Sequence, residues 1–207
     1  MLVLGEQRLV YLANPKTATQ AIRAMLGPHA GATPVEVADR HINVNTYLKK
    51  WAARLTGTLG GTVETFAVVR DPVARLGSWF RYRQRDQMEG RENSTKGLSF
   101  EAFIEARLMG DPPPFARIGR QDRFVGYDGA RILVDHVFDY ARLPLLVRFV
   151  SDRVGDTLSL GQRNVSPQVE AKLDLSPALL ARLKAAHAEE FALYARVAEK
   201  GVLRRER

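Results

Sequence analysis

The sequence predicts an α/β fold in which helices flank a mostly parallel central sheet. Strand-like apolar runs alternate with amphipathic segments of helical spacing, and this order is typical of parallel strands joined by helices. The chain has 207 residues, which is enough for one sizeable core. Hydrophobic residues make up 45% and charged residues 26%, so most of the chain is expected to be folded.

The first strand-to-helix unit covers the N-terminal part of the chain. A strand is predicted over residues 8–13, and a helix over residues 17–26, where apolar side chains recur with helical spacing. Gly27 and Pro28 are expected to end this helix. Residues 31–41 contain Gly, Thr and Pro close together and are predicted to form a loop.

The second unit begins with a helix that Asn43 is expected to cap, and it continues with a strand over residues 64–69. Asp71 and Pro72 then suit the N-cap and the first position of the next helix. Residues 86–97 are polar and contain glycine, so they are predicted to form a loop.

Four further elements complete the predicted fold. Ser99 is expected to cap an amphipathic helix, and the prolines of residues 111–114 break the chain after it. A third strand is predicted over residues 132–138 and a helix over residues 143–154. Ser176, followed by proline, opens the last helix, which carries an apolar stripe made of Leu180, Leu183, His187, Phe191 and Tyr194.

The chain shows no internal repeat, and a single domain is expected over residues 1–207, with residues 84–123 as an insertion. The absence of cysteine excludes disulfides, thiolate metal sites and a cysteine nucleophile. Charge comes too early at the N-terminus for a secretory signal, and no apolar run approaches the roughly 20 residues of a membrane span. We therefore expect a cytoplasmic protein without an integral membrane segment.

The formal net charge is +8, from 31 Lys and Arg against 23 Asp and Glu. Such an excess favours polyanionic partners, for example nucleotides, acidic glycans, nucleic acid or a membrane surface. Because the arginines are spread along the chain, a soluble protein with an ordinary basic surface is the alternative explanation.

An apolar strand leads directly into a lysine-containing helix start near the N-terminus. The segment after the strand reads Asn14-Pro15-Lys16-Thr17-Ala18-Thr19-Gln20. Backbone N–H groups at a helix start point toward an anion, and a lysine adds a full positive charge. The Walker pattern of nucleotide triphosphatases requires glycine before the lysine, and Pro15 occupies that position. A solvated turn residue is the alternative explanation of Lys16.

A second junction of this kind follows the strand over residues 64–69, which Arg70 ends. Arg70 would lie at the carboxyl edge of the sheet, where ligands bind in open α/β folds, and its planar guanidinium suits a phosphate. Ser78 lies two turns into the following helix. The alternatives are an ion pair of Arg70 with Asp71 or with another surface acid, and a neutral serine on the helix surface. Together, the two junctions predict a ligand with phosphate-like groups at both ends.

These junctions resemble those of the sulfotransferases that use 3′-phosphoadenosine 5′-phosphosulfate (PAPS), in the branch with carbohydrate O-sulfotransferases and many bacterial homologues. That branch has a Pro-Lys-Thr loop after a strand, and a Val-Arg-Asp/Asn-Pro segment with a serine eight positions past the arginine. The resemblance implies a P-loop-like three-layer fold. It also implies that residues 15–20 hold the 5′-phosphosulfate and that Arg70 and Ser78 hold the 3′-phosphate. Members often carry a trio such as Gly-Gly-Thr where this chain has Ala18-Thr19-Gln20.

The resemblance covers most of the chain through further, weaker matches: Tyr82-Arg83, Phe100-Glu101-Ala102-Phe103, Val134-Asp135-His136-Val137 and Asn164-Val165-Ser166. Arg163 directly precedes the last of these. It is a further candidate for the 3′-phosphate, and a surface position is the alternative.

The resemblance implies an in-line displacement at sulfur, comparable in layout to phosphoryl transfer. Lys16 would neutralise the charge that grows on the leaving oxygen. Family members place a catalytic histidine in the region of His41, and the pKa of histidine suits proton transfer. Asp39 and Glu36 are substitutes, and a purely structural role of His41 is the alternative. We predict that His136 and His187 are structural.

The predicted function is transfer of a sulfuryl group from PAPS to an acceptor hydroxyl on a carbohydrate or glycoconjugate. Adenosine 3′,5′-bisphosphate would be the product, and no metal or nucleic acid is implied. A kinase or triphosphatase is the first alternative, because residues 132–135 form an acid-ended strand, and magnesium dependence would distinguish it. A non-catalytic polyanion binder is the second, although no nucleic-acid module is recognisable.

Overall fold

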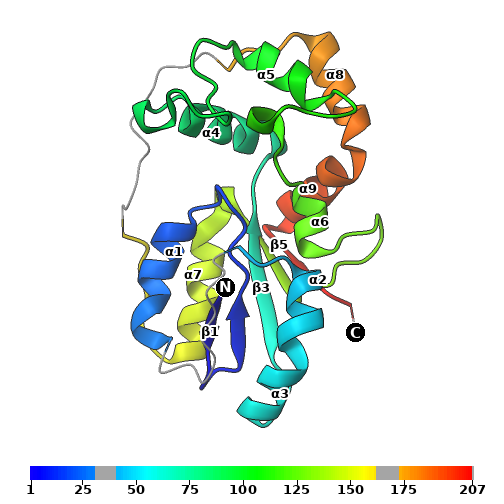
Figure 1. The fold of residues 1–207 in the computed structure, drawn as a ribbon. Helices are drawn as coiled ribbons and strands as arrows, with labels where there is room; N and C mark the ends of the chain where they lie inside the picture. The colour runs from blue at the N-terminus through cyan, green and yellow to red at the C-terminus, as the bar shows by residue number, and fades with distance from the viewer. Residues whose placement is uncertain (31–40, 162–172, 207) are drawn as a thin grey trace.

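The structure is a computed structural model, and it describes residues 1–30, 41–161 and 173–206. At its centre lies a five-stranded sheet in the order β1-β2-β3-β4-β5 (Figure 1). Its strands are β1 (Leu2–Leu4), β2 (Leu9–Tyr11), β3 (Glu64–Val69), β4 (His136–Asp139) and β5 (Val202–Arg204).

The sheet is mixed. The three inner strands β2, β3 and β4 are parallel, whereas β1 and β5 pair antiparallel at the two edges. The prediction of a mostly parallel sheet is therefore wrong. Both edge strands are three residues long, too short to show an alternating pattern in the sequence. β1 pairs with β2, which follows it in the chain, and β5 pairs with β4, which lies far from it in the sequence.

Helices cover both faces of this sheet (Figure 1). One face packs against α1 (Thr19–Leu26) and α7 (Leu143–Val154), and the other against α2 (Val44–Tyr47), α3 (Ala53–Leu59), α6 (Gln121–Val125) and α9 (Ala188–Lys200). Residues Thr65 to Val69 of β3 are all buried, as expected for a parallel strand covered on both faces. The predicted α/β class with flanking helices is confirmed.

A third hydrophobic core lies above the carboxyl ends of the inner strands (Figure 1). It joins α4 (Pro72–Arg83), α5 (Phe100–Arg107) and α8 (Pro177–Ala186) through Leu76, Phe80, Phe103 and Leu183. Residues 84–123 supply α5 and its connections to this core. Short 3₁₀ turns lie at Gly27–His29, Asp86–Met88, Pro114–Ala116 and Tyr140–Arg142, and a π-helical turn joins α2 to α3 at Leu48–Ala52.

Three predicted helix caps are confirmed by their hydrogen bonds. The side chains of Asn43, Asp71 and Ser99 accept from the backbone N–H three residues further on, at 2.9, 2.8 and 3.1 Å. Each bond satisfies one of the N–H groups that a helix start leaves without a partner. Local sequence thus determines where these helices begin.

Three predicted boundaries are wrong. The helix expected from residue 17 begins at Thr19, because the chain before it follows a left-handed path. The strand expected over 132–138 is β4 at His136–Asp139, since Leu133 and Val134 donate instead to the carbonyl of Val125 in α6. The single last helix is divided into α8 and α9, because His187 leaves the helical conformation (φ −123°, ψ 35°).

Candidate functional site

The two strand-to-helix junctions lie side by side at one edge of the sheet. Strands β2 and β3 are adjacent and parallel, so the segment from Asn14 and the residue Arg70 both follow the carboxyl ends of their strands. The Leu12 N–H continues the pairing by donating to the Phe66 carbonyl at 2.8 Å. This edge is where ligands bind in open α/β sheets.

Gln121, at the start of α6, connects the two junctions. Its Oε1 accepts from Asn14 Nδ2 at 3.2 Å and from the Arg70 backbone N–H at 3.0 Å. Its Nε2 donates to the Arg70 carbonyl at 2.7 Å. Asn14 Nδ2 also donates to the Val68 carbonyl at 2.9 Å. Because Asn14 and Gln121 are fully buried, these bonds fix the spacing of the two loops.

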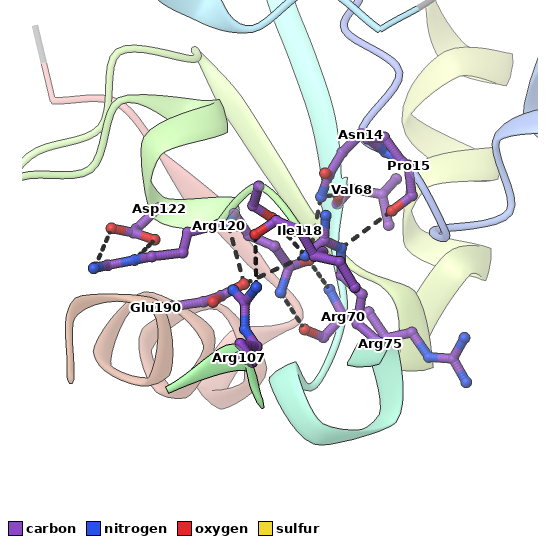
Figure 2. Close-up of polar contacts among 12 residues, drawn as sticks. Asn14, Pro15, Val68, Arg70, Arg75, Arg107, Ile118, Arg120, Asp122 and Glu190 are labelled. Carbon is purple, nitrogen blue, oxygen red and sulfur yellow. Dashed lines mark hydrogen bonds and ion pairs between the residues drawn. The ribbon is translucent and has the colours of Figure 1, made fainter. Parts of the chain in front are cut away.

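A buried ion pair supports the same arrangement from α4 and α9 (Figure 2). Arg75 Nη1 lies 3.6 Å from Glu190 Oε1, and both side chains are 3% exposed. Arg75 Nε donates to the Pro15 carbonyl at 3.1 Å, while Glu190 Oε1 accepts from the Gln121 N–H at 3.0 Å. Burial is the main cause that lowers the pKa of Arg75 to about 10. The pair therefore ties the lysine loop to two helices.

The lysine loop has a strained backbone. Lys16 and Ala18 are non-glycine residues with φ of 69° and 60°, and the hydroxyl of Thr17 donates to the Asn14 carbonyl at 2.7 Å. When residues with left-handed and right-handed backbone conformations alternate, successive N–H groups turn to the same side, and this geometry binds anions. Among the described residues, the N–H groups of Thr17, Ala18 and Thr19 donate to no backbone carbonyl. Such strain is typical of functional sites.

The ammonium of Lys16 lies among aromatic rings and arginines. Its Nζ is 4.3 Å from the ring centre of Tyr82 and 5.5 Å from that of Trp79. Burial, followed by the positive charges of Arg85, Arg70 and other arginines, lowers the pKa of Lys16 to about 8. No carboxylate of the described residues forms an ion pair with Lys16. The surroundings of this lysine are thus prepared for an anion.

Arg70 and Ser78 lie at the second junction. The Arg70 guanidinium is stacked 4.4 Å from the ring centre of Tyr140, and burial is the main cause that lowers its pKa. The predicted alternative of an ion pair with Asp71 is not found, since the Asp71 carboxylate caps α4 instead. Ser78 is half-buried on α4. Arg70 is therefore positioned by an aromatic ring rather than neutralised by an acid.

His41 lies next to the lysine loop. Its Nδ1 is 2.7 Å from the Ala13 carbonyl, which can only accept, so Nδ1 carries a proton and Nε2 is the acceptor of the neutral ring. The side chain is exposed and contributes to the wall of a cavity of about 560 Å³ that also reaches Pro15 and Trp79. This tautomer is the one that a general base requires.

Several candidate residues lie outside the described part of the chain: Arg163, Asn164, Val165, Ser166, Asp39 and Glu36. Among the residues that are described, no group of three or more His, Cys, Asp or Glu side chains could hold a metal ion. No helix in that part of the chain has the length and apolar character needed to cross a bilayer. Gln20, in the first turn of α1, is exposed.

The sequence prediction missed three buried residues that link the two loops to the surrounding helices, namely Gln121, Arg75 and Glu190. One signal was present, because Glu190 shares a helical stripe with the buried Leu193 and Val197. A carboxylate at a core position of a helix indicates a buried partner. Gln121 offered no such signal, since a glutamine at a helix start is common on protein surfaces.

Comparison of the chain with protein-family models, with curated proteins and with solved structures gave no match.

Proposed function

We propose that this protein is a PAPS-dependent sulfotransferase of the P-loop-like kind. The observation that carries the proposal is the pair of cationic loops at the carboxyl ends of adjacent parallel strands, which Gln121 holds at a fixed spacing. A donor with a phosphosulfate at its 5′ end and a phosphate at its 3′ position has one anion for each loop.

Each residue has a role in the proposed reaction. The N–H groups of residues 17–20 and Lys16 hold the 5′-phosphosulfate, and Arg70 with Ser78 holds the 3′-phosphate. The acceptor oxygen forms a new bond to sulfur as the bond from sulfur to the 5′-phosphate oxygen breaks. His41 Nε2 takes the proton of the acceptor hydroxyl, and Lys16 stabilises the charge left on adenosine 3′,5′-bisphosphate.

The position of Asp135 weakens the kinase or triphosphatase alternative. Asp135 Oδ2 accepts from both the N–H and the hydroxyl of Thr65 at 2.8 Å. Thr65 lies at the start of β3, and Asp135 precedes β4, so this carboxylate lies at the sheet edge opposite Lys16. A magnesium-binding acid would have to lie beside the phosphates.

Calorimetric titration with adenosine 3′,5′-bisphosphate tests the proposal. The wild type should bind it, and Arg70→Ala should bind it at least about tenfold more weakly, because a charge-assisted contact is lost. Lys16→Ala and Arg70→Ala should each lower sulfuryl transfer from PAPS by roughly 100-fold or more.

Arg148→Ala is a suitable control, because Arg148 is an exposed residue of α7 that belongs to neither loop and does not line the cavity. It should leave nucleotide affinity unchanged. A wild-type protein that does not bind the nucleotide would refute the proposal. Binding that depends on magnesium would favour the kinase or triphosphatase alternative.

A further inference from the structure

The cavity beside the lysine loop lies between that loop and the helical elements above the sheet. Its lining includes Asn14, Pro15, Trp79, Arg107, Arg123 and His187. Trp79 lines the cavity and lies 5.5 Å from Lys16 Nζ. A molecule in this cavity would therefore meet the group that Lys16 holds.

Buried polar atoms without a partner are concentrated around this cavity. Of the nine such side-chain atoms found among the described residues, five belong to four residues that line it: Asn14 Oδ1, Trp79 Nε1, Arg107 Nε and both ring nitrogens of His187. Folded proteins rarely leave buried polar atoms without a partner, so a cluster of them around one cavity points to a polar occupant. The prediction that His187 is merely structural does not account for this position.

The chemistry of these atoms restricts the occupant. Trp79 Nε1 and Arg107 Nε can only donate, whereas Asn14 Oδ1 can only accept. Neutral His187 offers one donor and one acceptor, and burial together with Arg107 and Arg120 lowers its pKa to about 4. Hydroxyl groups both donate and accept, so a molecule with several hydroxyls satisfies this mixed set.

Only some of the arginines that line the cavity form ion pairs with carboxylates. Three of its arginines face carboxylates, since Arg120 pairs with Asp122 at 2.6 Å, Arg117 with Asp111 at 2.8 Å and Arg75 with Glu190 at 3.6 Å.

Two arginines of the wall, Arg107 and Arg123, form no ion pair with any described residue. Arg107 is 6% exposed and uses Nη1 to donate to the Ile118 carbonyl at 2.7 Å, which leaves Nε unused. Glu190 and Asp122 lie beyond ion-pair distance of Arg107, but they still partly offset its charge. Arg123 adds a positive charge that forms no ion pair within the described residues, so the cavity favours a negatively charged occupant.

We propose that this cavity is the acceptor site, and that the acceptor is a sugar-like molecule bearing a carboxylate or a sulfate group. Its acidic group lies against Arg107 and Arg123, its hydroxyls meet Trp79 and His187, and its reacting hydroxyl lies near His41. The inference rests on the proposed function, because only that function supplies a donor at Lys16.

Three methyl glycosides that differ at one position test the inference: methyl β-D-glucoside, its 6-sulfate and methyl β-D-glucuronide. Each is titrated calorimetrically into the protein saturated with adenosine 3′,5′-bisphosphate. At least one acidic sugar should bind about tenfold more tightly than the neutral glucoside, and the better of the two identifies the acidic group. Arg123→Ala should abolish this preference, and Arg148→Ala should retain it. Arg123 is exposed, so its removal should leave the melting temperature unchanged.

His187→Phe keeps a ring of similar size but removes both nitrogens, so it should weaken binding of all three sugars. Equal binding of neutral and acidic sugars, binding of none, or a preference that survives Arg123→Ala would overturn the inference. If the nucleotide itself does not bind, the proposed function fails. Titration of the sugars alone then still shows whether the cavity prefers an acidic molecule.

Discussion

Lys16 is held in surroundings that oppose its own charge. It is partly buried, lies against two aromatic rings, and is surrounded by arginines, which together lower its pKa from 10.5 to about 8. Between these two values, an unfolded chain binds more protons than the folded one, so stability should rise with pH across this range. An anion bound at Lys16 would remove this cost at neutral pH. A lysine held in such surroundings lowers stability, a cost that is typical of functional residues.

The lowered pKa of Lys16 predicts a pH-dependent affinity for the donor. Only the protonated lysine attracts an anion, so the affinity for adenosine 3′,5′-bisphosphate should fall as the pH rises through about 8. Between pH 7 and pH 9 the loss should be roughly tenfold. Titration calorimetry across this range measures it. Lys16→Met should bind weakly at every pH, and an unchanged pH profile in this variant would contradict the assignment.

At the scale of secondary-structure elements, a buried polar network between helices supports the two loops. Arg75 of α4 and Glu190 of α9 form a buried pair, and Glu190 also accepts from the backbone of Gln121 in α6. Three helices and the lysine loop therefore share one network. The value of such a pair lies less in its net energy than in the geometry that it specifies.

The buried pair predicts a large effect of a small substitution. Glu190→Gln preserves the side-chain shape and an acceptor oxygen but leaves the buried Arg75 without its counter-charge. The free energy of unfolding should fall by about 3–5 kcal/mol, measured by urea denaturation. Glu199→Gln, on the exposed side of α9, should change it by less than about 0.5 kcal/mol. Similar values for both variants would show that the pair is not essential to the fold.

At the scale of the whole molecule, the net charge of +8 and the two cationic loops are separate properties. The excess charge comes from many arginines, whereas the loops involve a few residues held at fixed positions. General attraction to polyanions should therefore survive changes that destroy the site.

This separation predicts different results for two binding assays. Lys16→Met should elute from a heparin column at nearly the same salt concentration as the wild type, because one charge among many is removed. The same variant should lose most of its affinity for adenosine 3′,5′-bisphosphate. A non-catalytic polyanion binder would show no special dependence on Lys16 in either assay, and that result would favour the second alternative.

The positions of strands β2 and β3, the caps Asn43, Asp71 and Ser99, and both cationic loops were predictable from the sequence. These features depend on side-chain periodicity and on hydrogen bonds between residues three positions apart, so neighbouring residues determine them. The edge strands were not predictable, because three residues carry too little pattern and their pairing depends on the sheet that is already present.

Only the tertiary structure decided which buried side chains contact the two cationic loops. Asn14 and Arg70 meet Gln121 from 107 and 51 positions away, and no local pattern encodes such a contact. It arises because helix packing brings α6 to the carboxyl edge of the sheet. The sequence by itself determined which cationic residues follow the strand ends. The packing of buried polar side chains decided how far apart they are held, because those chains must find partners once water is excluded.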